Sequence, residues 1–498
     1  MHYLRWLILR FCILTTVFTQ SFVVNAQEMW GITTSNYAGS SGATLNPATL
    51  ITTKLYFDLN IVTADIFFQN NYAYIHRKDY SLFKFISKSP EFPKYGEDEM
   101  PFDHYYGTND KYIYASELIK GPSAMLAYGR HAFAIHTGAR VLTSANGIPY
   151  DIANFGYYGL DYAKQHNIDY NSRNITTSAL ILGEIGISYA YAFRKISMDE
   201  WAAGFTIKRY FSPGGAYASV NDLNYIVVND STINIKNLDG EVGYSYRMDY
   251  DDNSYPDDGP FIKGGGFGLD IGFTFQDKAL SYQKKRIRRL CSQKYIDYYY
   301  RFGFSILDLG YINFKNNAMV QDYNNVSKYW IDIDTIQYHN MNQLTRTLSN
   351  EFYGDPDASY AGNKVKVMLP TAISVQGDYR IYRRWYAGAV WILPVRLGKS
   401  YMRRPAQVVV IPRYESPKME FSIPVSLYDY RTVRVGAAFR YYFLTVGTDD
   451  LMGLMGLKDF TGIDFYFSLK INFRKGYCGR FKRNLPCENE EYGIRRRY

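Results

Sequence analysis

The chain has 498 residues and a formal net charge of +9; 47% of its residues are apolar and 17% are aromatic, with 50 tyrosines. The positive charge is scattered and forms no basic stripe, so nucleic acid is not an expected partner. No zinc-ligand spacing, nucleophile elbow or Walker motif occurs in the sequence, which therefore predicts neither a cofactor nor an enzyme.

Residues 1–26 have the pattern of a secretory signal peptide. Arg5 supplies positive charge, the following stretch Trp6–Val24 is mostly apolar, and Ala26 is a small residue at the expected cleavage point. We therefore expect export and cleavage after Ala26. A retained membrane anchor is the alternative, but Arg10 interrupts its apolar run. The rest of the sequence holds no apolar run of about eighteen residues, so it predicts no membrane-spanning helix.

The stretch Ser35–Leu50 is rich in glycine, serine and alanine and is too prone to turns to form a strand that faces lipid. We predict that residues 27–52 form a hatch that folds back into the lumen of a barrel. Its candidate functional motif is the segment Asn46, Pro47 and Ala48. In this motif the Asn46 side chain can bond its own backbone and fix the turn.

Segments of alternating apolar and polar residues then follow one another almost to the end of the chain, as barrel strands do. We count between 12 and 18 candidates and predict 14, because single-chain bacterial barrels have even strand numbers. The expected fold is all-β: a transmembrane antiparallel β-barrel over residues 53–473. The candidate strands are Leu55–Val62, Ile66–Ile75, Ser123–Gly129, His131–Ala145, Ile181–Phe193, Gly204–Phe211, Tyr225–Ile235, Glu241–Met248, Gly265–Phe275, Tyr300–Leu307, Leu309–Phe314, Val365–Ile381, Trp385–Val395, Ala406–Tyr414, Met419–Leu427, Thr432–Arg440, Phe443–Gly447 and Gly462–Phe473.

The last candidate, Gly462–Phe473, alternates cleanly except at Tyr466 and is long enough to cross a bilayer at a tilt. A half-buried strand of a soluble sandwich is the alternative interpretation. The many tyrosines favour the barrel, whose membrane interfaces carry aromatic girdles; a tyrosine-lined sugar-binding surface is the alternative. If the C-terminus is periplasmic, the strand directions make Tyr441–Tyr442, Ser416–Pro417 and Tyr382–Arg383 short periplasmic turns.

Two predicted outer loops carry candidate sites. Asp249, Asp251 and Asn253 have the opening spacing of a calcium loop, but the glycine and glutamate that complete such a loop are missing, so a solvated acidic loop is favoured. The other loop is apolar, and it either packs across the barrel mouth or receives a hydrophobic ligand. Its apolar residues are Leu451, Met452, Leu454, Met455 and Leu457.

Residues 474–498 follow the last strand and are predicted to form a periplasmic tail. Cys478 and Cys487 lie in this tail, and export would allow them to form a disulfide. Two free thiols are the alternative.

Several stretches of the chain together resemble a family of uncharacterised outer-membrane β-barrels from Bacteroidota, known only as a domain of unknown function. That family is distantly similar to the long-chain fatty-acid transporters, which have a 14-stranded barrel, a hatch with an Asn-Pro-Ala segment and passage of hydrophobic solutes. The resemblance implies the same features here, with Asn46, Pro47 and Ala48 as the hatch motif. The matching stretches are Asn36–Leu50, Gly156–Tyr162, Gly266–Gly272, Ile306–Gly310, Pro370–Tyr379, Arg413–Ser416, Gly436–Arg440, Gly447–Leu451 and Thr461–Phe467.

Two functions lead at this point; an outer-membrane hydrolase, for which no catalytic constellation is recognisable, and a soluble secreted lectin are the remaining alternatives. The first is a passive conduit for a hydrophobic or amphipathic small molecule in the outer membrane of a Gram-negative bacterium, with membrane lipid as the surrounding partner. The second is a barrel without transport that anchors a surface or secretion complex or assists its assembly. An apolar path through the lumen would favour the first function, and a lumen filled with paired polar residues would favour the second.

Overall fold

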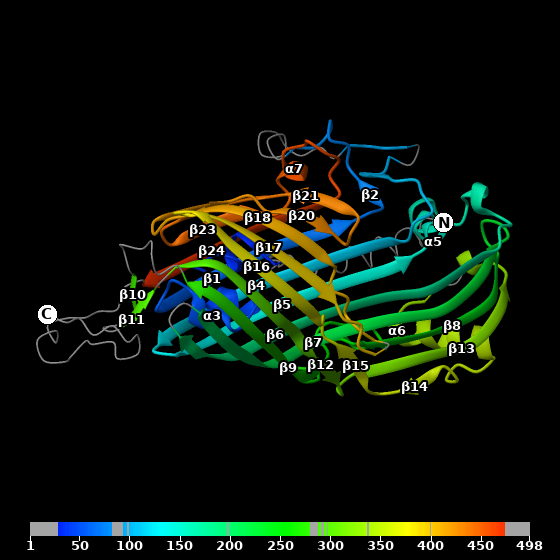
Figure 1. The fold of residues 1–498 in the computed structure, drawn as a ribbon. Coiled ribbons are helices and arrows are strands. Elements are labelled where there is room, and N and C mark those ends of the chain that lie inside the picture. The colour runs from blue at the N-terminus through cyan, green and yellow to red at the C-terminus, as the bar shows by residue number, and fades with distance from the viewer. Residues whose placement is uncertain are drawn as a thin grey trace, which may run out of the picture.

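The computed structural model describes residues 28–473 except 82–92, 97–98, 197–198, 279–286, 290–292, 296, 336–337 and 399. The chain forms one closed antiparallel β-barrel whose wall is crossed 14 times (Figure 1). Nine crossings are single strands: β1 (Phe57–Asn70), β4 (Lys111–Tyr128), β5 (His131–Ile148), β6 (Tyr170–Ile196), β7 (Asp199–Val227), β17 (Trp385–Pro394), β18 (Gln407–Glu415), β23 (Leu444–Thr448) and β24 (Gly462–Phe473).

The other five crossings are interrupted strands, in which two or three short pieces follow one another along the same line of the wall. They are β8 (Ile233–Ser245) with β9 (Gly264–Lys278), β12 (Tyr298–Phe314) with β13 (Ala318–Trp330), β14 (Tyr360–Gly362) with β15 (Val365–Met368) and β16 (Ala372–Tyr382), β19 (Met419–Ser422) with β20 (Val425–Tyr428), and β21 (Thr432–Val435) with β22 (Ala437–Tyr441).

The barrel closes because β1 pairs with β4 on one side and with β24 on the other. Phe57 at the start of β1 lies opposite Phe473 at the end of β24, so the first strand begins where the last one ends. We call this end of the barrel the terminal end and the opposite end the mouth. Two small sheets lie outside the wall, β2 (Ala73–Tyr74) with β3 (Asp103–His104) and β10 (Ile287–Arg289) with β11 (Gln293–Tyr295).

Short helices occupy the connections outside the wall, and α6 lies beside β8 and β13 at the mouth (Figure 1). They are α5 (Tyr150–Tyr158), η2 (Ala163–Gln165), η3 (Ile333–Thr335), α6 (Met341–Tyr353) and α7 (Leu451–Leu454). Over the described part of the chain, no helix is long and apolar enough to cross a membrane.

The strands bury their polar faces and expose their apolar faces. In β24, Asp464 and Ser468 are fully buried, whereas Phe465 and Ile471 are each 41% exposed. A soluble sandwich buries the opposite face, because its core is apolar; a wall with an apolar exterior and a polar interior is the membrane type. The predicted alternation of this strand is confirmed, and Tyr466 belongs to the interior. The wall is therefore that of a transmembrane barrel.

The predicted strand number of 14 is confirmed, but four strand predictions are wrong. Tyr300–Leu307 and Leu309–Phe314 are one strand, β12, whose register shifts between Ile306 and Leu309. Leu55–Val62 and Ile66–Ile75 are one strand, β1, whose bulge between Asn60 and Val62 breaks the alternation. Tyr225–Ile235 spans the turn between β7 and β8. The strand β13 has no counterpart among the predictions, because it is largely polar.

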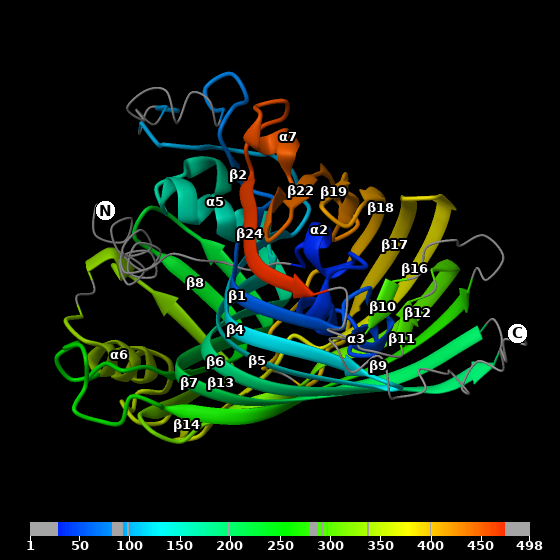
Figure 2. The same cartoon turned by 90° about the vertical axis from the view of Figure 1, so that its left-hand side faces the viewer.

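The hatch lies inside the ring of strands (Figure 2). It consists of α2 (Trp30–Thr33), η1 (Gly39–Thr44) and α3 (Thr49–Thr52), and residues 53–56 link it to β1. Trp30 and Leu45 pack against wall residues such as Ile411. On another side, apolar hatch residues meet a surface of small wall residues. The apolar residues are Leu50 and Ile51 of the hatch together with Leu55 of the linker. The wall residues include Ala127, Ala132, Ala190 and Ala202.

Candidate functional site: the hatch and the lumenal cavity

The Asn46-Pro47-Ala48 turn sits in a recess of the wall. The Asn46 side-chain oxygen accepts a hydrogen bond from the Ala48 amide at 3.0 Å, which closes the turn. Its side-chain nitrogen donates to the Phe273 carbonyl at 3.0 Å and to the Gln376 side chain at 2.8 Å, which ties the turn to two parts of the wall. The turn is therefore stabilised by a hydrogen bond within itself and by hydrogen bonds to the wall.

Three glycines on neighbouring strands make the recess possible: Gly204 of β7, Gly272 of β9 and Gly303 of β12. A Cβ atom at Gly204 would lie 2.8 Å from the Ala48 nitrogen, and one at Gly303 would lie 3.0 Å from the Asn46 amide nitrogen. A Cβ atom at Gly272 would overlap the Asn46 side chain. Any other residue type would push the turn into the lumen, so these glycines provide the space for it.

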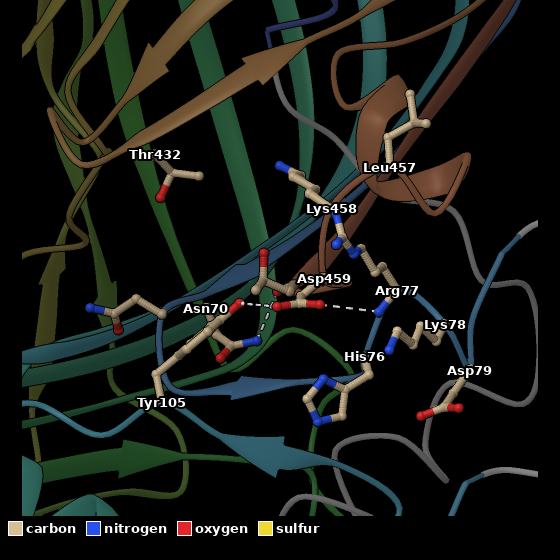
Figure 3. A pocket seen from close by; sticks show the side chains of 12 residues that line it. Asn70, His76, Arg77, Lys78, Asp79, Tyr105, Thr432, Leu457, Lys458 and Asp459 are labelled. Atoms are coloured by element: carbon tan, nitrogen blue, oxygen red, sulfur yellow. Dashed lines mark hydrogen bonds between the residues drawn. The ribbon is translucent and has the colours of Figure 1, made fainter.

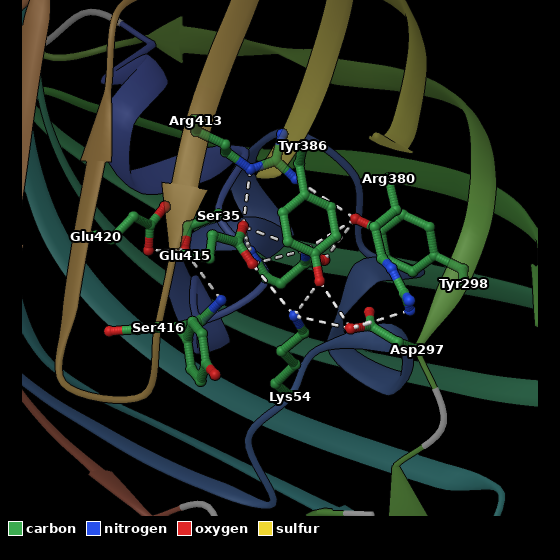
Figure 4. A network of polar contacts seen from close by, with 12 residues as sticks. Ser35, Lys54, Asp297, Tyr298, Arg380, Tyr386, Arg413, Glu415, Ser416 and Glu420 are labelled. Atoms are coloured by element: carbon green, nitrogen blue, oxygen red, sulfur yellow. Dashed lines mark hydrogen bonds and ion pairs between the residues drawn. The ribbon is translucent and has the colours of Figure 1, made fainter. Parts of the chain in front are cut away.

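At the terminal end, the hatch and its linker are tied to the wall by buried charged groups (Figure 4). Asn36 donates its backbone amide to Glu415 at 3.1 Å and its side-chain amide to the same carboxylate at 2.9 Å. The Lys54 ammonium lies 2.7 Å from the Tyr386 hydroxyl, 3.3 Å from Glu415 and 3.5 Å from Asp297. We call Asn36, Lys54, Asp297, Tyr386 and Glu415 the terminal network.

Lys54 stays charged in this network. Burial lowers the pKa of its ammonium, but the carboxylates of Asp297 and Glu415 outweigh burial and hold the pKa well above the ordinary value. On the wall side, Arg413 donates to Glu415 at 2.7 Å, so this carboxylate faces a cation on both sides. A buried pair of this kind resists separation, because removing one partner leaves a buried charge uncompensated.

On the mouth side of the hatch lies a lumenal cavity of about 130 Å³. Its floor contains Glu28, Met29 and Thr44 of the hatch. One part of its lining is aromatic and apolar, namely Phe67, Tyr114, Leu118, Leu142, Met402 and Tyr428. The other part is charged, namely Lys120, Arg140, Glu184, Lys208, Asp308 and Arg404. The cavity therefore offers both an apolar and an ionic surface to one occupant.

Several buried polar atoms of this lining have no hydrogen-bond partner in the described structure. Those of Arg140 and Glu184 belong to an ion pair, whereas three other residues have neither kind of partner there. They are the Lys120 ammonium, both amide atoms of Gln407 and the Tyr428 hydroxyl. Lys120 and Gln407 are each 1% exposed, and Tyr428 is fully buried. An unsatisfied buried polar group costs about 1–3 kcal/mol, so groups gathered around a cavity indicate that water or a ligand normally meets them.

An inward-folded loop between β17 and β18, described at residues 395–398 and 400–406, narrows the lumen above the hatch. Arg404 donates to Glu28 of the hatch at 2.7 Å and lies 3.8 Å from Asp308 of the wall. Arg403 bonds the Asn146 side chain and pairs with Asp429 at 2.8 Å. The loop thus connects the start of the hatch with three sides of the barrel.

The mouth holds a wider polar cavity of about 850 Å³ (Figure 3). Its lining includes Arg77 and Lys458 as well as Asp459, whose carboxylate accepts a hydrogen bond from the Arg77 amide at 3.1 Å. Leu457 also lines this cavity and is 61% exposed. The cavity is a polar vestibule with one apolar side chain at its rim.

The structure places the sequence-predicted residues in different surroundings. In the apolar outer loop, Leu454 is buried, whereas Leu451, Met455 and Leu457 are 37%, 41% and 61% exposed; Met452 lies between these extremes. The segment therefore packs on one side and remains open on the other. Cys478 and Cys487 lie outside the described residues.

The acidic loop contacts the start of α6. Asn253 accepts a hydrogen bond from the Met341 amide at 3.1 Å, and Asp251 accepts one from the Asn342 side chain at 2.7 Å. The Asp249 carboxylate accepts from the Asp251 amide at 2.8 Å. In the described ranges, no group of three or more His, Cys, Asp or Glu side chains is arranged to hold a metal ion.

Reasoning from the sequence missed the terminal network, the inward-folded loop and the unpaired polar groups of the lumenal cavity. One feature could have revealed part of them: Arg413 and Glu415 lie on the buried face of β18, and buried charged residues need a partner inside the barrel. Their partners Asn36 and Lys54 come from the far end of the sequence, and no local pattern connects them.

A closed transmembrane barrel with an internal hatch and a lumenal cavity is the class of protein that this geometry defines. Within that class, the chain belongs to a family of unknown function, DUF5723, whose model matches residues 47–449. The predicted membership in an uncharacterised family is confirmed. Among curated protein sequences, none matches.

The solved structures that are similar to this chain include the following three. A deletion mutant of the TodX monoaromatic hydrocarbon channel has a TM-score of 0.41 at 10% identity, over 88% of this chain and 95% of that one. The Pseudomonas putida toluene transporter TodX has a TM-score of 0.37 at 10% identity, over 91% and 99%. A Pseudomonas aeruginosa FadL homologue has a TM-score of 0.29 at 12% identity, over 91% and 100%.

Proposed function

We propose that this protein is a passive conduit for an amphipathic small molecule across the outer membrane of a Gram-negative bacterium. In this proposal a signal peptide is removed on export, the terminal end faces the periplasm and the solute enters at the mouth. The observation that carries the proposal is the lumenal cavity, because its unpaired polar atoms and its aromatic lining lie around one space directly above the hatch.

The two surfaces of the cavity favour a solute with a polar head and an apolar body. Along β4, Tyr114, Leu118 and Lys120 all line the cavity, so the aromatic and cationic parts of the lining follow one strand. Lys120 is the unpaired cation among them. An acidic head group would supply the partner that the Lys120 ammonium lacks, and a flat or flexible apolar body would contact the Tyr114 and Tyr428 rings.

The hatch shares no backbone pairing with the wall in the described structure, so its displacement would break side-chain contacts only. In the described structure it contributes no strand to the barrel sheet, and its contacts with the wall are side-chain hydrogen bonds, ion pairs and small apolar patches. Because the wall keeps its own backbone pairing on both sides, displacement of the hatch would leave the sheet intact. The solute path would open where the hatch now separates the cavity from the terminal end.

A second function, a barrel without transport that anchors or helps assemble a surface complex, is favoured by one observation. The lumen at the terminal end is filled by paired charged groups, among them Arg413 with Asp378 and Lys54 with Glu415. Such a lumen suits a permanently closed barrel. The two proposals differ in whether the cavity takes up a solute.

Binding of an acidic amphiphile to the purified barrel tests the first proposal. We expect Lys120→Met and Gln407→Leu each to weaken binding of a fluorescent fatty-acid analogue about tenfold, because each removes a buried polar partner worth about 1.4 kcal/mol. Lys236→Met, at an exposed position on β8, is the control and should leave binding unchanged. Equal affinity in all variants would place binding outside the cavity and favour the scaffold.

A further inference from the structure

Three tight turns at the terminal end lie side by side. The turn between β16 and β17 contains Arg383 and Arg384, and the turn between β18 and β19 contains Lys418. The Glu415 amide donates to the Arg384 carbonyl at 2.8 Å, and the Tyr442 amide, in the turn between β22 and β23, donates to the Lys418 carbonyl at 2.7 Å. The three cations therefore belong to one continuous rim, which we call the basic strip.

Each cation of the basic strip lies against a tyrosine. Arg383 is 5.0 Å from the centre of the Tyr382 ring, and Lys418 is 5.9 Å from that of Tyr442. Arg384 donates to the Tyr414 hydroxyl at 3.2 Å. These contacts orient the cations beside aromatic rings, which occupy the level of lipid head groups in membrane proteins.

Large apolar and aromatic side chains continue outward from the basic strip along the barrel wall. Tyr382 is 59% exposed, Trp385 51%, Tyr441 55% and Phe443 59%. The cations thus lie at the boundary between the lipid-facing wall and the solvent at the terminal end. This is the place where a phospholipid that covers the wall would have its phosphate.

No exposed carboxylate compensates the basic strip in the part of the chain that the structure describes. The acidic residues beside it in sequence, Glu415 and Glu420, are each 2% exposed and pair inward with Arg413 and Arg440. One loop at the mouth has the opposite charge: the largely exposed loop 249–258 holds five aspartates. The barrel is therefore cationic on this part of its terminal rim and acidic on a loop at its mouth.

We propose that the basic strip binds the phosphate groups of anionic phospholipids in the leaflet at the terminal end. Guanidinium groups form paired hydrogen bonds with phosphate, and the lysine adds a mobile positive charge. The adjoining aromatic residues hold the glycerol region, and the exposed apolar wall takes the acyl chains. This inference rests on the proposed membrane location but not on transport.

Retention of lipid by the purified full-length barrel tests this inference. The probes are phosphatidylglycerol and phosphatidylcholine with identical acyl chains, compared by native mass spectrometry after equilibration in mixed micelles. We expect the wild type to retain phosphatidylglycerol at least about threefold more than phosphatidylcholine. In the variant Arg383→Gln, Arg384→Gln, Lys418→Gln, the ratio should fall to about one.

A matched control removes the same charge at the mouth. The variant Lys164→Gln, Lys236→Gln, Arg346→Gln should keep the wild-type preference, and both variants should keep the heat-dependent gel shift of a folded barrel. An unchanged preference in the basic-strip variant overturns the proposal. Displacement of phosphatidylglycerol by an equal concentration of inorganic phosphate also overturns it, because the site would then take a free anion. Amphiphile binding by the basic-strip variant reports separately on the proposed function.

Discussion

At the scale of single residues, the barrel is specified by which side chains point inward. Ser468 of β24 is fully buried and bonds Thr63 at 2.7 Å, whereas Leu469, the next residue, belongs to the outer face. Polar groups inside find partners in the hatch or across the lumen, and apolar groups outside meet lipid. The alternation that identifies the strand is thus the same alternation that separates the two environments.

The exposed apolar face of β24 predicts that a charged substitution there destabilises the folded barrel. We expect Phe465→Arg, on the outer face farther from the terminal rim, to lower the yield of folded barrel, because a cation on the lipid face near the bilayer midplane costs about 2–4 kcal/mol. The control is Asn472→Arg, at a half-buried position of the inner face at the terminal end. Ser468→Arg is unsuitable as a control because Ser468 is fully buried. Equal yields of both variants in membrane fractions would contradict this assignment of faces.

Lys54 gives a prediction about pH. The carboxylates beside it raise the pKa of its ammonium in the folded protein, so its contribution to hatch anchoring is fully present below the unfolded pKa of about 10.5. That contribution is lost only as the pH rises through the higher folded value. Protease protection of the hatch should therefore be constant between about pH 6 and 9, and release within this range would count against the ion pairs.

Removal of the Lys54 charge tests the ion pairs between the hatch linker and the wall. Lys54→Met removes the cation that Glu415 and Asp297 share, and because Arg413 and Arg380 remain beside them, the cost is less than the ~3–5 kcal/mol of a charge left without any partner. Because the wall keeps its own hydrogen bonds, we expect the hatch to become accessible to protease while the barrel remains folded on a heat-shift gel. A barrel that fails to fold would show that the hatch is part of the wall's stability.

At the scale of elements, the hatch and the wall fit each other at the Asn46-Pro47-Ala48 turn. The turn approaches the wall closely because glycines line its recess. The motif and its self-closing hydrogen bond could be expected from the sequence, since asparagine before proline favours such a turn. The glycines could not be connected with it, because they lie on three strands more than 150 residues away in the chain.

The glycines of the recess predict that one added methyl group displaces the hatch turn. Gly272→Ala should displace the turn and expose the hatch to protease, because the new Cβ atom overlaps Asn46 and overpacking of this kind costs about 1–3 kcal/mol. Gly377→Ala on β16 is the control, since its nearest neighbour would lie at an ordinary distance of 4.0 Å. If the hatch is equally resistant to protease in both variants, the glycines do not determine its position in the barrel.

At the scale of the whole molecule, the fold was more accessible to sequence reasoning than the site. Strands with clean alternation, such as β24, were predicted to the residue, whereas polar β13 was missed because its lumenal and outer faces differ little in polarity. The terminal network and the lumenal cavity depend on side chains from the hatch, β4, β17, β18 and β20 meeting across the lumen. Only the closed barrel brings these residues together.

The account as a whole depends on whether the hatch gates a path through the lumenal cavity. The most direct measurement is the rate at which a fluorescent amphiphile enters proteoliposomes that carry equal amounts of folded wild-type barrel or a barrel lacking Ser35–Thr44. We predict that the deletion raises the rate at least about tenfold over the wild type, because it removes Asn36, the main contact between the hatch and Glu415. Equal rates in the two preparations, with both barrels folded, would contradict the conduit and leave a closed scaffold as the function.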